Sequence, residues 1–477
     1  MKTNLKKVAL FPLFFCVISA SFGSCSKVGL EDDNNGEDTT GIIKDHFTTY
    51  YIDSKEGNDA NAGTSEYKAW KTLLRLDTLT LKPGDFVRFK RGSEFVGPLF
   101  VRCSGTKSKY ITLSDYGDST LHAPSFTNTE FVQDNFGNCI RVKGSYVIVE
   151  NLYCHHTSAY KPGNYVTDGG WITWEMGAIY IDKGAKNCIV RNNEMFDCLV
   201  SIKSYGENAI IENNYVHDCN RILAEWNWGP IGIWLGADFQ EVRYNRIINI
   251  SVVDPHIVWG NGTGGADGGA MEIDDARYEK THISIHHNYS RECQGFLEVT
   301  WSDVLASPKY ENFSIHHNVC DDYQQFIALW RGANCRIENN TIIRRRENPC
   351  NWGVFNITQR DGHNLIQNNI IVVEKNIRIF NLGLGANDAT PNNIINNNLY
   401  FAASGTLDIG KEGPGGYPVY GDPNFVNYAT GNKAEDFAIK AGSPAINKGL
   451  SLGYTLDFTG TTIPQSYISD IGAFEYK

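Results

Sequence analysis

Several features that mark common protein classes are missing from this 477-residue sequence. Its central region lacks the 3.6-residue apolar periodicity of helices, which argues against a helical fold. No Gly-rich phosphate loop, CxxC pair or GxSxG motif occurs, which disfavours nucleotide-binding and serine-hydrolase functions. Positive charge is scarce, with 43 Lys and Arg against 54 Asp and Glu and a formal net charge of −11. Nucleic acid and anionic membranes are therefore not expected partners.

What the chain does contain is a repeat. The phrase NCIVRNN at 187–193 returns as NAIIENN at 208–214 and in six further varied copies. The second Asn of each copy falls at residues 193, 214, 245, 288, 318, 340, 369 and 398. The tight copies are 21 or 22 residues apart, and longer steps carry insertions. A period of this length predicts stacked supersecondary units.

Each copy alternates apolar and polar residues like a short strand, and the Asn pair then turns the chain. A second short strand often opens on Gly, at 177–182, 231–236, 269–274, 295–300 and 353–358. These signals predict an all-β, single-stranded right-handed parallel β-helix, with asparagines stacked in a ladder at one corner. A β-propeller is the alternative, but its blades need roughly 40–45 residues.

The cysteines fit the same repeat. Cys198, Cys219 and Cys293 each follow a ladder Asn by five residues, so we expect them to stack inside the coil as small hydrophobes. A chain of this length has a large core without disulfides, although disulfides stay an alternative.

The N-terminus predicts export. Residues 1–24 carry three lysines and then an apolar run, Val8–Phe22, that is too short to span a membrane. Small residues before Cys25 resemble a bacterial lipobox, which implies lipidation of Cys25 and an outer-membrane anchor at the cell surface. Phe22 departs from the usual Leu, so simple secretion stays open. Residues 25–46 are acidic and predict a disordered tether.

Both ends of the coil need covering. Residues 47–125 should hold the first rungs and a cap helix, in which Trp70, Leu73, Leu74 and Leu76 form one apolar face. The β-helix should occupy 126–405, and residues 406–477, rich in Gly and Pro, should close the other end irregularly.

These end segments also carry a family resemblance. YYIDSKEGNDANAGT, LKPGDFVRFKRG, DPNF, SPAINKG and DIGAFEY together resemble the right-handed parallel β-helix proteins of Bacteroidetes, a pectate-lyase-like superfold. The resemblance covers nearly the whole mature chain and implies a glycan-degrading hydrolase or lyase. It matches no single family's catalytic motif. The acidic tether after a lipidated Cys resembles surface-exposed lipoproteins of the Bacteroides group.

Long insertions predict where a substrate would bind. We place them at 157–176, 220–230, 251–268 and 301–311, all between the Asn corner and the next Gly-opened strand, which would gather them into one wall. They are rich in Trp and acids, which suits a carbohydrate groove, although a given Trp could simply anchor its loop. The candidate substrate-binding residues, including side chains on the adjoining strands, are Trp226, Trp228, Trp234, Trp259, Trp301, Trp330, Arg331 and Lys203.

Two glutamates are the favoured catalytic pair. Glu272 and Glu298 point outward from equivalent positions, so in-register stacking would place them about 4.8 Å apart at the backbone. Adjacent carboxylates raise the pKa of one of them, as glycoside hydrolysis requires. Asp267 and Asp274 are alternative members. A solvated acidic face is the alternative without function.

A polysaccharide lyase is the second enzymatic hypothesis. β-Elimination would use Lys203, Arg331 or Arg360 as the basic group, and Asp267, Asp274 and Asp275 could hold Ca²⁺. A hydrolase would require no cofactor. The third hypothesis is a non-catalytic glycan-binding surface protein. The doublets His286-His287 and His316-His317 suggest a metal, but their identical repeat positions favour stacked turn histidines.

Overall fold

The structure, a computed structural model, describes residues 47–477 except 133–134, 159–174, 224–227, 253–257, 260–261, 264–266, 276, 300–309, 347–352, 358–361 and 383–391. The predicted signal segment, tether and lipidated Cys25 all fall within residues 1–46 and so lie outside the described residues. Within the described range, no helix has the length and apolar character needed to cross a bilayer.

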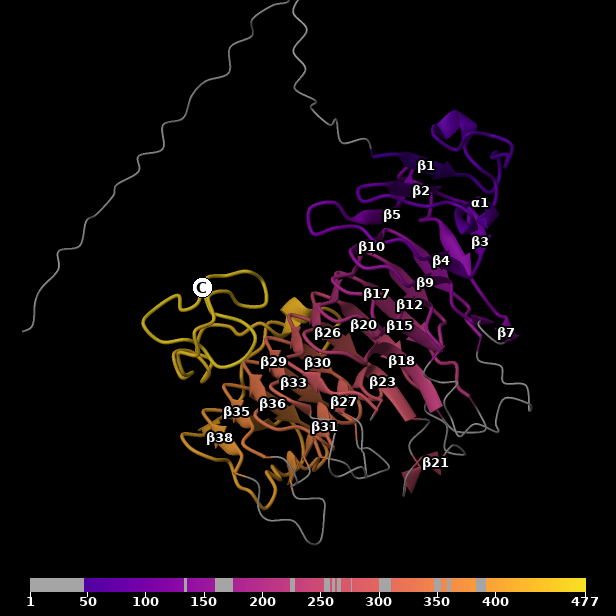
Figure 1. The fold of residues 1–477 in the computed structure, drawn as a ribbon. Helices are drawn as coiled ribbons and strands as arrows, with labels where there is room; N and C mark the ends of the chain where they lie inside the picture. Colours follow the sequence, from indigo (N-terminus) through magenta and orange to yellow (C-terminus); the bar gives the residue numbers. More distant parts are fainter. Residues whose placement is uncertain are drawn as a thin grey trace, which may run out of the picture. The chain divides into compact units, whose positions relative to one another are not determined.

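Three long parallel sheets make up the described chain (Figure 1). Sheet A contains β1 (Thr49–Ile52), β2 (Phe86–Lys90), β5 (Ile111–Tyr116), β10 (Val147–Glu150), β13 (Ile189–Arg191), β16 (Ile210–Glu212), β19 (Glu241–Arg243), β25 (Ser284–His286), β29 (Ser314–His316), β32 (Arg336–Glu338), β35 (Leu365–Gln367) and β38 (Ile394–Asn396). Sheet B contains β3 (Glu94–Val96), β6 (Ser125–Thr127), β11 (Tyr153–His155), β14 (Glu194–Phe196), β17 (Tyr215–Cys219), β20 (Arg246–Ile250), β26 (Tyr289–Arg291), β30 (Val319–Asp321), β33 (Thr341–Arg344), β36 (Ile370–Val373), β39 (Leu399–Ala402) and β40 (Val419–Tyr420). Sheet C contains β4 (Leu99–Val101), β9 (Ile140–Val142), β12 (Ile179–Ile181), β15 (Val200–Ser204), β18 (Trp228–Leu235), β23 (Asp267–Ile273), β27 (Leu297–Val299), β31 (Ile327–Leu329), β34 (Phe355–Ile357) and β37 (Phe380–Leu382).

The remaining elements are short. Three two-stranded pairs are β7 (Phe131–Val132) with β8 (Asn135–Phe136), β21 (Val258–Trp259) with β22 (Gly262–Thr263), and β24 (Lys280–Thr281) with β28 (Tyr310–Glu311). The helical segments are α1 (Leu74–Asp77), η1 (Glu66–Lys68) and η4 (Ala434–Phe437).

Each coil visits sheets A, B and C in turn, and each strand pairs in parallel with its equivalent one coil away. The predicted right-handed parallel β-helix is therefore confirmed, and the five Gly-opened segments all supply strands of sheet C. The predicted repeat unit lacked one strand that the structure contains. The residues after the Asn pair, such as Tyr215–Cys219, form a strand of their own in sheet B, so each coil has three strands.

The predicted Asn ladder stands at the corner between sheets A and B. The first residue of each pair adopts positive φ, as Asn192 (55°) and Asn213 (55°) do. The second is buried: Asn214 donates to Asn245 Oδ1 at 2.9 Å and accepts from Asn193 Nδ2 at 3.1 Å. The same bond continues through every coil from Asn193 to Asn398. These amides satisfy turn backbone that water cannot reach.

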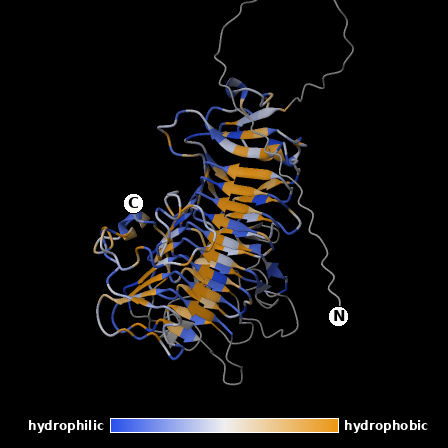
Figure 2. Cartoon of the chain, turned by 90° about the vertical axis from the view of Figure 1, so that its left-hand side faces the viewer, coloured by the Kyte–Doolittle hydropathy of each residue, from blue (hydrophilic) through white to orange (hydrophobic). Residues whose placement is uncertain are grey.

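The core fills the inside of the coil. Apolar side chains from all three sheets form one cluster, and Figure 2 shows strands coloured as hydrophobic stacked one above another. Cys198, Cys219 and Cys293 are each 0% exposed within it, and every described cysteine is free. The predicted burial is thus confirmed, and Cys198 stacks on Cys219, whose Sγ accepts from the Cys198 N–H at 3.4 Å, whereas Ile250 occupies the next position, before Cys293.

The two ends differ from the predictions in detail. α1 is a single turn that buries Leu76, but Leu74 is 70% exposed and Trp70 lies before the helix, so the predicted four-residue apolar face does not form. Residues 406–416 continue the last coil through the bonds of Phe380 N–H to Ile409 O and Gly416 N–H to Ile395 O. Beyond residue 421 the chain folds back along the outer face of sheet B, where Phe425, Phe437 and Ile471 pack on its side chains.

Candidate active site on the outer face of sheet C

A column of outward residues runs across sheet C, one from each coil. In register order it contains Phe100, Arg141, Tyr180, Lys203, Trp234, Glu272, Glu298, Ala328, Asn356 and Asn381. The flanking side chains Met271, Ile273, Leu297 and Val299 enter the core. This alternation confirms the predicted outward direction of the two glutamates.

Glu272 and Glu298 are direct register partners on neighbouring coils. Glu272 is 4% exposed, and Glu298 is half-buried. Burial raises the pKa of Glu298 to about 7, the charge of Asp274 adds to the rise, and a hydrogen bond from Trp330 partly opposes it. Burial has this effect because a low-dielectric site penalises the charged carboxylate. At neutral pH a large fraction of the Glu298 side chains is therefore protonated.

Trp330 holds that carboxyl group. Its Nε1–H donates to Glu298 Oε1 at 2.8 Å, and the indole is half-buried. The neighbouring Arg331 is 9% exposed, with its guanidinium 5.9 Å from the ring centre of Tyr310. Trp330 thus contacts a candidate catalytic group directly, whereas Arg331 is largely covered.

The structure corrects the role expected of Trp234 and Lys203. Both are 0% exposed, and Lys203 Nζ lies 2.8 Å from the centre of the Trp234 ring. Trp228, 9% exposed, packs with Trp234 and Leu223 in an apolar cluster that includes residues of β18. Because neither side chain is exposed, neither Trp234 nor Lys203 can contact a sugar directly.

Lys203 nevertheless has an electrostatic part in the site. Burial lowers its pKa, and the charges of Asp274 and Glu272 oppose that fall. Lys203 and these carboxylates are therefore close enough to interact, so a protonated Lys203 would stabilise the ionised forms of Asp274 and Glu272.

The three aspartates predicted to hold Ca²⁺ have different surroundings in the structure. Asp275 is 1% exposed, accepts from Tyr205 Oη at 3.0 Å and is paired with Arg277. Asp274 follows the end of β23 and is half-buried. Asp267 begins the same strand, but its side chain lies outside the described part. Because Asp275 already has partners for both oxygens, it is poorly suited to bind a cation.

A charged cluster that sequence reasoning missed lies at the other end of the column. Arg141 bonds Asp182 Oδ1 at 2.6 Å and Glu175 Oε2 at 2.7 Å, and its guanidinium lies 4.6 Å from the Tyr180 ring centre. A cavity of about 310 Å³ opens here, lined by Lys143, Glu175, Tyr180, Asp182, Lys183, Tyr205, Arg277 and Tyr278. Aligning Ile140-Arg141-Val142 with the later Gly-opened strands would have placed Arg141 in the column.

The insertions flank sheet C on both edges, not one. Segments 157–176, 220–230 and 251–268 lead into sheet C strands, as predicted. Segment 301–311 instead follows β27 and precedes β29 of sheet A, so its predicted place between the Asn corner and a Gly-opened strand is wrong. Trp226, Trp301 and Arg360 lie outside the described residues, as does the side chain of Trp259.

No family model matches the chain. A lacto-N-biosidase of Bifidobacterium longum subsp. longum is 28% identical over 338 residues, covering 59% of this chain and 20% of the relative. The chain thus matches about a fifth of that protein's length. Among solved structures, XylC with xylose has a TM-score of 0.54 at 12% identity, covering 90% of this chain and 98% of that one. Pectate lyase Pel9A has a TM-score of 0.52 at 14% identity, covering 90% and 96%. At such identities the likeness establishes a shared pectate-lyase-like β-helix fold.

Proposed function

We propose that this protein is a glycoside hydrolase that cleaves an oligosaccharide or polysaccharide on the outer face of sheet C. The observation that carries the proposal is the in-register pair Glu272 and Glu298, of which Glu298 has a pKa raised to about 7. Glycosidic cleavage needs one protonated and one ionised carboxyl, and the raised pKa of Glu298 supplies the protonated one.

In this mechanism Glu298 is the general acid. It protonates the leaving oxygen of the glycosidic bond, and Trp330 fixes the orientation of its carboxyl through the 2.8 Å bond. Glu272 is the favoured ionised partner, because neighbouring rungs are about 4.8 Å apart and a retaining enzyme needs a carboxyl separation of about 5–5.5 Å. Asp274 is the alternative partner, since its charge also acts on Glu298.

Two observations favour hydrolysis over β-elimination. The curated relative is named as a lacto-N-biosidase. In addition, Lys203, the strongest candidate for a lyase base, is 0% exposed beneath Trp234 and cannot reach a sugar carbon. Export and lipid anchoring at Cys25 to the outer membrane, which would present the groove to external glycans, belong to this proposal.

A glycan panel tests it. The purified chain is incubated with neutral and uronate-containing oligosaccharides and polysaccharides, and reducing ends and the ultraviolet absorbance of unsaturated uronate are followed. New reducing ends without that absorbance are expected. Growth of the absorbance would identify a lyase, and binding without any cleavage would identify a glycan-binding protein.

A further inference from the structure

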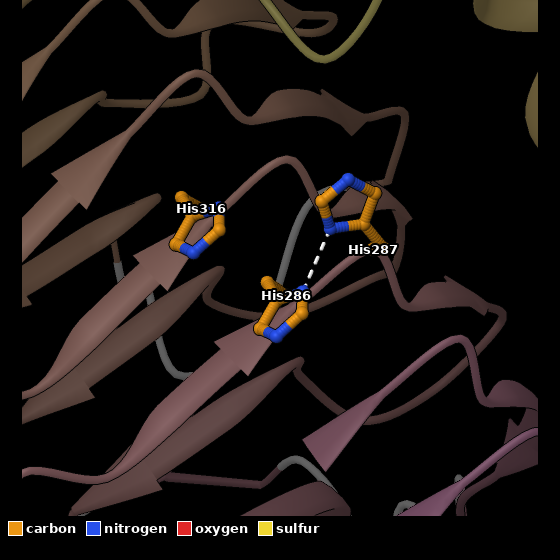
Figure 3. A group of neighbouring side chains, drawn as sticks. All are labelled: His286, His287 and His316. Carbon is orange, nitrogen blue, oxygen red and sulfur yellow. Dashed lines mark hydrogen bonds between the residues drawn. The ribbon is translucent and has the colours of Figure 1, made fainter. Parts of the chain in front are cut away.

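Four histidines lie together at the corner between sheets A and B, far from the column on sheet C. His286 and His316 are register partners that stack with ring centres 4.8 Å apart and planes 3° apart. His287 and His317, which follow them at positive φ, stack at 5.2 Å. The predicted stacking of turn histidines is therefore confirmed. Figure 3 shows His287 turned toward His286, with His316 on the next coil.

Within each doublet the two Nδ1 atoms face one another. The separation is 2.7 Å between His286 and His287 and 3.0 Å between His316 and His317. A neutral imidazole carries one ring proton, so such a contact is favourable only if one Nδ1 is protonated and the other is not.

The doublet His316–His317 meets that condition with two neutral rings. Among the described residues His317 Nε2 is buried and has no hydrogen-bond partner, so without a metal its proton is better placed at Nδ1, where it donates to His316; coordination of an ion by His316 would require this hydrogen bond to rearrange. An N–H left unpaired in the interior would cost more than an unpaired lone pair.

The doublet His286–His287 does not meet this condition with two neutral rings. His287 Nε2 lies 3.1 Å from the backbone oxygen of Asp457, which can only accept, so the proton of His287 must sit at Nε2. His286 Nε2 lies 3.0 Å from Glu241 Oε1, and the pKa of Glu241 is lowered, first by that hydrogen bond, so this carboxylate also accepts. Both ring protons are thus drawn outward, and two Nδ1 lone pairs converge. One further positive charge is needed between them.

We propose that this charge is a divalent transition-metal ion of the zinc class, bound by His286, His287 and His316. One ring nitrogen of each lies within 4.8 Å of the others. Imidazole nitrogens suit Zn²⁺, and tetrahedral Zn–N bonds of about 2.0–2.1 Å set neighbouring nitrogens roughly 3.3 Å apart. To admit the ion, the 2.7 Å contact between His286 and His287 would have to open slightly, and the His316 ring, which is parallel to that of His286, would have to rotate so that a nitrogen lone pair points at the ion.

The surroundings match those of metal-binding histidines, which usually donate their second ring N–H to a carboxylate or a backbone carbonyl. His286 has the first kind of partner and His287 the second. Burial lowers the pKa of His287 to about 4 and also lowers that of His316, which keeps both rings in the neutral form that binds metals. Arg243 and Arg336 are the nearby cations, and each is paired with a glutamate.

A bound ion would have a structural role. It would join the coils of β25 and β29 and fix the C-terminal segment over them. That segment already contributes Asp457 to His287, and its Tyr454 packs 4.5 Å from the His316 ring centre.

Metal content and stability test the proposal on the full chain. The chelator-treated protein is titrated with Zn²⁺, bound metal is measured by mass spectrometry, and Co²⁺ is used as a visible probe of tetrahedral coordination. We expect one bound equivalent and a rise in Tm with added Zn²⁺. His286→Gln and His316→Gln should each weaken binding at least 100-fold, and Glu241→Gln should weaken it about 10–100-fold.

His155→Gln is the matched control. His155 and His156 make the same Nδ1 contact, but within the described part of the chain no third ligand group joins them. This variant should keep the wild-type affinity. Circular dichroism checks that each variant is folded, and Glu241→Gln, which alters no ligand, covers the case in which a histidine variant does not fold. Failure of the wild-type chain to bind Zn²⁺, or equal binding by the His286 and His155 variants, would overturn the proposal and leave a proton between the two rings.

Discussion

Trp330 Nε1 donates a 2.8 Å hydrogen bond to Glu298 Oε1, and this bond joins two neighbouring coils at the proposed catalytic acid. The indole belongs to the residue that follows β31, whereas the carboxyl stands on β27, one coil earlier. The bond stabilises the ionised carboxylate, while burial and Asp274 destabilise it. The pKa of Glu298 therefore depends on three separate coils.

Trp330→Phe should raise the pKa of Glu298 above about 7. Phe keeps the ring but cannot donate, so the carboxylate loses the group that lowers its pKa. The limb of the kcat/KM profile that falls with rising pH should move to higher pH, and kcat should fall about tenfold because the acid is less well oriented. A pH profile that is unchanged would mean that Glu298 is not the titrating acid.

Glu298→Gln and Glu272→Gln should each lower kcat/KM at least about 10²-fold on the glycan identified by the panel. Asp274→Asn distinguishes the two candidate partners: a larger loss than in Glu272→Gln would assign the ionised role to Asp274. Glu94→Gln, on an exposed position of β3, is the control and should retain full activity. Wild-type rates in both glutamate variants would remove them from the site.

Replacing Glu298 should also change the pH dependence of stability. A carboxyl whose pKa is raised from 4.5 to about 7 in the folded state contributes stability below pH 4.5, and that stability is lost as the pH rises through 7. Glu298→Gln has no such loss, so its free energy of unfolding relative to wild type should improve by about 1–3 kcal/mol from pH 5 to pH 8. Denaturation at both pH values measures the difference. Buried Asp322, with a pKa also raised to about 7, acts equally in both proteins.

The Asn ladder should be the most sensitive feature of the fold. Asn214→Ala removes the oxygen that accepts from the buried Asn193 N–H and Nδ2 and should cost about 3 kcal/mol, seen as a lower denaturation midpoint. The adjacent Asn213 is exposed and adopts φ 55°, which glycine tolerates, so Asn213→Gly should cost less than about 1 kcal/mol. Similar losses in the two variants would show that the ladder bonds contribute little.

Much of the architecture could be predicted because the repeat is local and periodic. The spacing of the Asn pairs specifies the coil, and once coils stack in register, equivalent residues must be neighbours. That reasoning correctly placed Glu272 beside Glu298, the cysteines inside the core and the histidines in stacks. It could not separate the strand Tyr215–Cys219 from the turn before it, because one αL residue interrupts the strand without changing the apolar alternation.

The sequence by itself therefore determined the fold, the ladder and the outward column, since each follows from a repeated local pattern. Only the tertiary structure decided how exposed each member of that column is, with Glu298 half-buried, Glu272 4% exposed and Trp234 and Lys203 0% exposed. Trp234 and Lys203 have the same strand phase as the glutamates, yet Trp234 is packed with Trp228 and Leu223 from an insertion with no repeat of its own, and Lys203 lies against the Trp234 ring. The raised pKa of Glu298 and the converging nitrogens of His286 and His287 likewise arise from contacts between coils and with the C-terminal segment. Burial and electrostatic coupling depend on distances through space, which a repeat along the chain does not encode.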